Sequence, residues 1–206
     1  MTTAATAVFD LGGVVVRWDP AAAIAAEVGR ERAERFVSGA EFDFIEWNRR
    51  QDAGRPWADA EALATAGHPH LAAEIAAYRR HFAASLTGLV PGTGEILADL
   101  HAGGVRLVAL TNWSAETFPH APAKFPDVFA LFDDVVVSGA EGLIKPDPRI
   151  FDALARRLGH GLAGVFYVDD SAENVRAAAV AGMDAVLFTD APELRRQLRS
   201  RGLVGR

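Results

Sequence analysis

The sequence of 206 residues contains no cysteine. Disulfides, thiolate nucleophiles and cysteine metal ligands are therefore excluded. Positive charge is scarce as well, because 21 Lys and Arg residues stand against 27 Asp and Glu residues, for a formal net charge of -6 at pH 7. Binding along a nucleic acid requires a basic face. We therefore expect no nucleic-acid partner.

Long apolar runs are absent too. No stretch approaches the ~20 apolar residues that a membrane-spanning helix needs. The start of the chain lacks the charged and apolar segments of a secretory signal. We expect no membrane partner and a cytoplasmic location. The length is sufficient for one domain, or for a core domain that carries a smaller insertion.

Short apolar runs alternate with helical segments along most of the chain. Five such runs are expected as strands, at residues 6–9, 105–110, 134–138, 165–168 and 185–189. Nearly continuous apolar strands that alternate with helices indicate a parallel sheet covered on both faces. The sequence therefore predicts an α/β fold with a Rossmann-like parallel sheet core.

This alternation stops between Pro20 and Leu86. The segment is rich in Ala, Glu and Arg and is broken at residues 29, 54–56 and 67–69 by glycine and proline. Such punctuation predicts three or four helices, the last over residues 71–85. We expect a core domain of residues 1–17 and 87–206, with residues 18–86 inserted as a helical domain.

Polar residues follow the expected strands at four places. They are Asp10, Thr111, the loop from Gly139 to Lys145, and the pair Asp169 and Asp170. Parallel strands share a direction, so these residues should meet at one edge of the sheet. Neighbouring carboxylates repel one another, which favours a bound cation, and oxygen ligands suit Mg²⁺. A hydroxyl and a lysine beside them would suit phosphoryl transfer.

Four motifs carry a resemblance to a known family. They are Phe-Asp-Leu-Gly-Gly at residues 9–13, Leu-Thr-Asn at 110–112, Lys-Pro-Asp-Pro at 145–148 and Val-Asp-Asp-Ser-Ala-Glu-Asn at 168–174. In this order and spacing they resemble the haloacid dehalogenase-like hydrolase superfamily, and the helical insertion is similar to its cap domain. Within the superfamily the chain looks most similar to small sugar-phosphate phosphatases whose first motif also reads Asp-Leu-Gly.

The resemblance implies a Mg²⁺-dependent phosphatase that acts on a small phosphorylated metabolite through an aspartyl-phosphate. Asp10 would be the nucleophile. The other implied catalytic residues are Thr111, which would bind phosphoryl oxygens, and Lys145, which would hold Asp10 and the phosphate charge. The implied substrate-binding residues are Gly13, Thr111, Asn112, Trp113 and Lys145. The implied metal ligands are Asp10, the carbonyl of Gly12, and Asp170, with Asp169 in support.

The sequence departs from the phosphatase pattern at Gly12. Most phosphatases of the superfamily have a second Asp there, which protonates the leaving group and activates water. Gly12 can do neither. The gap fits a substrate with a good leaving group, or a proton donor supplied by the cap or by water.

The same gap leaves two alternatives open. A 2-haloacid dehalogenase of this superfamily also lacks that Asp, because halide leaves without protonation, and it needs no metal. The paired acids Asp169 and Asp170 favour a metal-dependent phosphatase over this alternative. The second alternative is a non-catalytic binding protein on the same scaffold. The sequence leaves the substrate and the oligomeric state open.

Overall fold

The computed structural model describes residues 5–205. Its centre is a five-stranded parallel sheet with the strand order β5-β4-β1-β6-β7. The strands are β1 (Thr6–Phe9), β4 (Arg106–Thr111), β5 (Asp134–Val137), β6 (Phe166–Asp169) and β7 (Asp184–Leu187). All five expected strands are present, with ends displaced by no more than two residues. The expected α/β class is confirmed.

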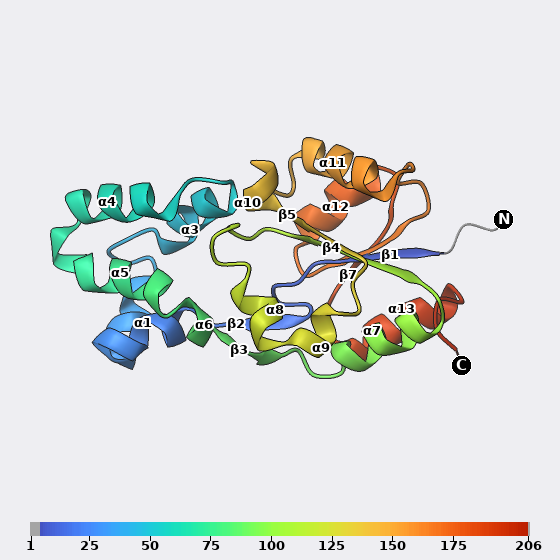
Figure 1. Cartoon of the computed structure of the whole chain (residues 1–206), viewed down its shortest axis with the longest axis horizontal. Helices are drawn as coiled ribbons and strands as arrows, with labels where there is room; N and C mark the ends of the chain where they lie inside the picture. The colour runs from blue at the N-terminus through green and yellow to red at the C-terminus, as the bar shows by residue number, and fades with distance from the viewer. Residues whose placement is uncertain (1–4, 206) are drawn as a thin grey trace.

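Helices cover both faces of this sheet (Figure 1). The helices of the core are α7 (Thr93–Ala102), α8 (His120–Lys124), α9 (Pro126–Phe129), α10 (Ser138–Glu141), α11 (Pro148–Leu158), α12 (Ala172–Val180) and α13 (Ala191–Ser200). In Figure 1, α11 and α12 lie on one side of the sheet, and α7 and α13 lie on the other. This is the covering that continuous apolar strands require.

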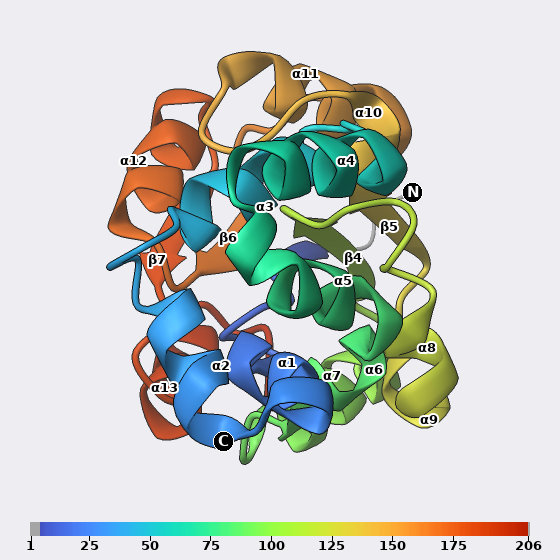
Figure 2. The ribbon, with the colours of Figure 1, turned by 90° about the vertical axis from the view of Figure 1, so that its left-hand side faces the viewer.

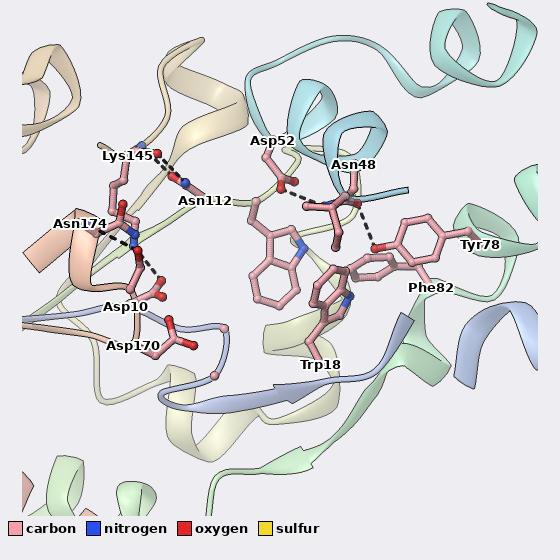
Figure 3. A pocket seen from close by; sticks show the side chains of 15 residues that line it. Asp10, Trp18, Asn48, Asp52, Tyr78, Phe82, Asn112, Lys145, Asp170 and Asn174 are labelled. Atoms are coloured by element: carbon pink, nitrogen blue, oxygen red, sulfur yellow. Dashed lines mark hydrogen bonds and ion pairs between the residues drawn. The ribbon is translucent and has the colours of Figure 1, made fainter. Parts of the chain in front are cut away.

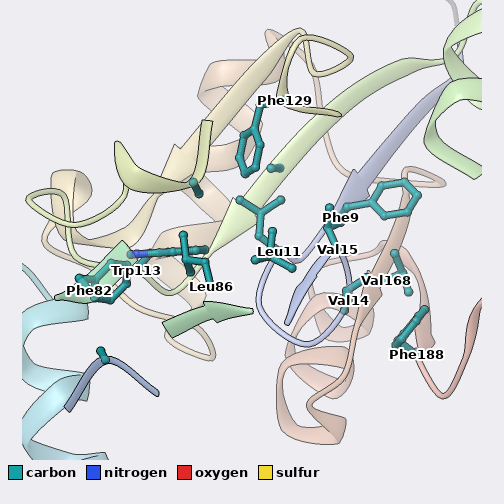
Figure 4. Packing of buried hydrophobic residues seen from close by; sticks show 14 of the residues in the cluster. Phe9, Leu11, Val14, Val15, Phe82, Leu86, Trp113, Phe129, Val168 and Phe188 are labelled. Carbon is teal, nitrogen blue, oxygen red and sulfur yellow. The ribbon is translucent and has the colours of Figure 1, made fainter. Parts of the chain in front are cut away.

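The side chains of each strand alternate between two apolar clusters. Phe9 packs in the cluster with Ile96 and Leu194 from α7 and α13, whereas its neighbour Val8 packs in the cluster with Ile150 of α11. Successive residues of a strand point to opposite faces, so both faces of β1 are buried. Figure 4 shows the first cluster continuing past the sheet to Trp113, Phe82 and Leu86.

The inserted segment lies between β1 and β4. It enters through β2 (Val16–Trp18) and leaves through β3 (Leu86–Leu89), which pair antiparallel. Between them are α1 (Pro20–Val28), α2 (Arg30–Val37), α3 (Phe44–Asp52), α4 (Trp57–Gly67), a 3₁₀ turn (Pro69–Leu71), α5 (Ala72–Arg80) and α6 (Phe82–Ser85). Figure 2 looks onto these helices, which lie over one edge of the sheet. We refer to this helical segment as the cap; its exact boundaries stay a prediction.

The cap has more helices than the three or four expected. One additional break separates α2 from α3, where Gly39 has φ +83° and the Asp43 carboxylate caps α3 by accepting from the Glu46 N–H at 3.0 Å. A second break falls at His81, so the helix expected over residues 71–85 is interrupted there and the chain turns toward β3. Neither break contains a proline, so both lack the punctuation that marked the expected breaks at residues 54–56 and 67–69.

The β2–β3 ribbon was not expected from the sequence. Its strands have three and four residues, too few for a clear alternating pattern. Within residues 5–205, no helix has the length and apolar character needed to cross a bilayer.

Candidate active site

The polar strand ends meet at the carboxyl edge of the sheet, beneath the cap. Asp10 follows β1, Thr111 ends β4, and Asp169 ends β6 with Asp170 after it. Lys145 comes from the loop after α10 and its side chain is 1% exposed. Figure 3 shows Asp10, Lys145 and Asp170 gathered at one end of a pocket.

Lys145 joins two of the strand ends. Its Nζ lies 2.9 Å from Asp10 Oδ1 and 2.7 Å from Asp169 Oδ2, and it donates to the carbonyl of Leu110 at 2.8 Å. The backbone N–H of Leu11 also donates to Asp10 Oδ1 at 2.7 Å. The Asp10 carboxylate is thus held in one orientation, as a nucleophile requires.

Burial and charge shift the pKa values of this group in different directions. Burial raises the pKa of Asp10 to about 7, although the ammonium of Lys145 opposes the shift. Burial alone would lower the pKa of Lys145, but the carboxylates of Asp10 and Asp169 outweigh it and raise that pKa. For Asp169, burial is outweighed by Lys145 and the pKa is lowered. Lys145 and Asp169 are therefore a charged pair at neutral pH.

Asp169 is a fully buried hub of hydrogen bonds. Besides Lys145, its carboxylate accepts from Tyr167 Oη at 2.5 Å, from the Ser171 N–H at 2.8 Å and from Asn174 Nδ2 at 3.1 Å. Both oxygens are occupied by these donors. This arrangement fits the supporting role expected for Asp169, while Asp170 is exposed and free to face a ligand.

Three carboxylates can hold a metal ion here. Ligand oxygens of Asp10, Asp169 and Asp170 all lie within 4.8 Å of one another. Lys145 balances one of these three negative charges, so two remain, which suits a divalent cation. The pKa of Asp170 is raised by burial and by the negative charge of Asp169. An all-oxygen donor set of this kind fits Mg²⁺.

The glycine pair after Asp10 has two different roles. Gly13 has φ +75°, and a Cβ there would overlap the carboxylate of Asp170. Gly12 has an ordinary φ, and a Cβ there would meet no atom within 4 Å. The backbone at position 13 lies so close to the Asp170 carboxylate that only glycine fits there, whereas position 12 has room for a side chain.

Asn112 and Thr111 differ in their access to the pocket. Asn112 lines it and also anchors the Lys145 loop, since its Nδ2 donates to the Lys145 carbonyl at 2.9 Å and its Oδ1 accepts from the Lys145 N–H at 2.8 Å. Thr111 is 1% exposed and is not part of the pocket lining. Contact of Thr111 with a phosphoryl group stays a prediction.

The pocket itself has a volume of about 600 Å³. From the core it is lined by Asp10, Gly12, Gly13, Asn112, Trp113, Lys145, Asp170, Ser171 and Asn174. From the ribbon and the cap it is lined by Trp18, Ile45, Asn48, Asp52, Tyr78 and Phe82. The cap residues were not expected from the sequence, because no motif surrounds them. One end of the pocket is charged and the other is largely aromatic.

Comparisons with known proteins agree with the motifs. Residues 4–182 match the haloacid dehalogenase-like hydrolase family. The chain is 28% identical to a sesquiterpene phosphatase of Aspergillus oryzae over 204 residues, 99% of this chain and 98% of that protein. It is 32% identical to a phosphoglycolate phosphatase of Cereibacter sphaeroides over 191 residues, 89% and 84% of the two chains.

A solved structure of similar fold is that of a haloacid dehalogenase family enzyme from Bacteroides thetaiotaomicron. One of its variants, in complex with magnesium and inorganic phosphate, superimposes with a TM-score of 0.72 and 18% identity, covering 91% of this chain and 95% of that one.

Proposed function

Since the chain belongs to the haloacid dehalogenase-like hydrolase family, we propose that it is a Mg²⁺-dependent phosphatase that works through an aspartyl-phosphate on Asp10. The observation that carries this proposal is the ion pair of the nucleophile. Lys145 Nζ lies 2.9 Å from Asp10 Oδ1, and the carboxylates of Asp169 and Asp170 lie in the same cluster. Carboxylates are used as nucleophiles in this way elsewhere.

Mg²⁺ would be held by Asp10, Asp170 and the carbonyl of Gly12, with Asp169 in support. The ion supplies positive charge beside the phosphoryl oxygens when it is bound. Lys145 orients Asp10 and adds a second positive charge next to the same oxygens. The hydroxyl of Thr111 and the N–H of Asn112 are the proposed donors to the remaining phosphoryl oxygens.

The pocket walls favour a substrate with an apolar organic group. Beyond the charged end, the lining includes Trp18, Trp113, Phe82, Tyr78 and Ile45. Broad aromatic surfaces bury hydrocarbon well. The sesquiterpene phosphatase among the relatives supports this choice. The sugar phosphate expected from the resemblance stays a prediction, which these walls favour less than a hydrophobic alcohol esterified to phosphate.

The two alternatives have weaker support. A metal-free dehalogenase has no use for Asp170, which stands with Asp10 and Asp169 in one cluster. A binding protein would not require a buried lysine that orients the nucleophile, and Lys145 costs free energy to bury. Both observations favour the phosphatase.

A screen for phosphate release tests the proposal. Purified protein with Mg²⁺ is given a panel of monophosphates: isoprenoid and aryl phosphates, sugar phosphates and phosphoglycolate. We expect the highest kcat/KM for the apolar members. A 2-haloacid in the same panel reports halide release. Preference for sugar phosphates would contradict the proposed substrate class, and halide release without phosphate release would contradict the phosphatase.

A further inference from the structure

The core supplies no proton donor beside Asp10, because Gly12 has no side chain. Among residues 5–205, the titratable side chains that line the pocket are Asp10, Asp52, Tyr78, Lys145 and Asp170. Asp10, Lys145 and Asp170 belong to the proposed phosphate and metal site. A side-chain donor for the leaving group would therefore come from the cap.

Asp52 is the last residue of α3 and faces the pocket from the cap. Figure 3 shows its carboxyl group on the side of the pocket opposite Asp10. Asn48 Nδ2 donates to Asp52 Oδ2 at 2.9 Å, which orients the carboxyl group. Ser138 Oγ, on the core, donates to the carbonyl of Asp52 at 2.5 Å. This bond ties the end of α3 to the core, and the Asp52 side chain lies in the lining of the same pocket as Asp10.

The surroundings of Asp52 favour its protonated form. Burial raises its pKa to about 7, opposed only by the backbone N–H of Ser114. The titratable group that faces it from α5 is Tyr78, and Asp10, Lys145 and Asp170 face it across the pocket. A carboxyl group that holds its proton near neutral pH is suited to general acid catalysis.

Tyr78 is the other cap group that could donate. Its hydroxyl already donates to Asn48 Oδ1 at 3.1 Å, and burial raises its pKa further above the ordinary value of 10.0. Its proton is much less available than that of Asp52. The chain Tyr78–Asn48–Asp52 instead fixes the carboxyl group of Asp52 in place.

We propose that Asp52 is the general acid and base of the reaction, in the role that Gly12 cannot fill; the proposal rests on the phosphatase activity proposed above. In the first step Asp10 forms a bond to phosphorus, the bond from phosphorus to the leaving oxygen breaks, and that oxygen takes the Asp52 proton to leave as an alcohol. In the second step a water oxygen attacks phosphorus, Asp52 accepts the water proton, and the bond to Asp10 breaks. Inorganic phosphate is released and both carboxyl groups return to their starting states.

A leaving-group series tests this role. General acid catalysis contributes about 10²–10⁴-fold, mostly for poor leaving groups. The unmodified protein should therefore hydrolyse aryl and primary alkyl phosphates of similar size at similar rates. Asp52→Asn, which keeps the size and the contact with Asn48, should lose about 10²–10⁴-fold on alkyl phosphates and little on aryl phosphates. Asp59→Asn, an exposed acid of the cap, is the matched control and should change neither rate.

A second site in the chain allows a rescue. Because position 12 has room for a side chain, Gly12→Asp in the Asp52→Asn background should restore hydrolysis of alkyl phosphates. In the unmodified protein, kcat/KM on alkyl phosphates should fall above pH 7, where Asp52 loses its proton. This fall should be absent in Asp52→Asn. If Asp52→Asn does not fold, as judged by thermal unfolding, Asp52→Ser is used for the same series.

The outcomes separate this role from the function on which it rests. Absence of phosphate release by the unmodified protein would overturn both. With release intact, a steep leaving-group dependence in the unmodified protein would overturn the role of Asp52 alone. An equal loss of kcat/KM on aryl and alkyl phosphates in Asp52→Asn would also overturn the role of Asp52 alone.

Discussion

The backbone of Gly13 lies directly against the side chain of Asp170, so that a Cβ on Gly13 would overlap the carboxylate of Asp170. The first motif and the last are thus in contact, although Gly13 and Asp170 are 157 positions apart in the chain. The left-handed backbone of Gly13 brings the main chain against the proposed metal ligand.

The first prediction concerns this contact. Gly13→Ala should displace Asp170 and strain the backbone, and so raise the Mg²⁺ concentration needed for half-maximal activity by about 10–100-fold. Gly104→Ala is the matched control, because Gly104 has the same φ of +75° and a Cβ there would meet no atom within 4 Å, and its Mg²⁺ requirement should stay unchanged. A Mg²⁺ titration of phosphate release measures both. Equal behaviour of the two variants would contradict the proposed place of Asp170.

The second prediction concerns the buried ion pairs. Lys145→Met leaves the carboxylates of Asp10 and Asp169 together without their cation, so the free energy of unfolding should fall by about 3–5 kcal/mol. Lys124→Met, at an exposed position, should change it by less than about 0.5 kcal/mol.

Urea unfolding at pH 7 and pH 5 compares the lysine variants. Part of the loss in Lys145→Met should be recovered at pH 5, because the raised pKa of Asp10 lets that group take up a proton. A Lys145→Met protein as stable as Lys124→Met at both pH values would show that the pairs are unimportant for folding.

The third prediction follows from the raised pKa of Asp52. Its pKa is about 7 in the folded protein against an ordinary value of 3.8, so the folded state binds the proton more tightly. Stability from this group is therefore present at low pH and is lost as pH rises from about 4 to 7. Asp52→Asn has no group to titrate at this position and so does not lose this stability. The Tm of Asp52→Asn minus that of the unmodified protein should therefore increase from about pH 4 to pH 7 and stay constant above pH 7.

Asp147→Asn serves as the control, because the pKa of Asp147 is shifted in the opposite direction from that of Asp52. The Arg149 guanidinium beside Asp147 lowers the pKa of that carboxyl to about 2. Asp147→Asn should therefore cost a little stability at neutral pH, and the cost should vanish as pH falls from about 4 to 2. Thermal unfolding from pH 2 to pH 8 measures both variants. A Tm difference for Asp52→Asn that does not vary with pH would contradict the shift.

The strand ends could be predicted from the sequence because their signals are local. Asp10 and the pair Asp169 and Asp170 each follow an apolar run, and parallel strands bring such ends to one edge. The loop from Gly139 to Lys145 was expected at the same edge for the same reason, but only the resemblance implied that Lys145 holds Asp10, since nothing in that loop says which way its side chain turns.

The cap half of the pocket could not be predicted in this way. Asp52, Asn48 and Tyr78 lie on two helices with ordinary sequences, and their meeting depends on how α3 and α5 pack. The anchor of α3 on the core, from Ser138 to the carbonyl of Asp52, spans 86 residues. Contacts of this kind are set by tertiary packing and leave no periodic signal in one sequence.

The central claim, that Asp10 is the nucleophile of a Mg²⁺-dependent phosphatase, is tested most directly by one measurement. Phosphate release from an aryl phosphate is followed for the unmodified protein with Mg²⁺, for the same protein with chelator, and for Asp10→Asn with Mg²⁺. The account predicts release in the first case only, with losses of several decades in the other two. Release that survives chelation, or a folded Asp10→Asn that keeps more than about a tenth of the activity, would contradict it.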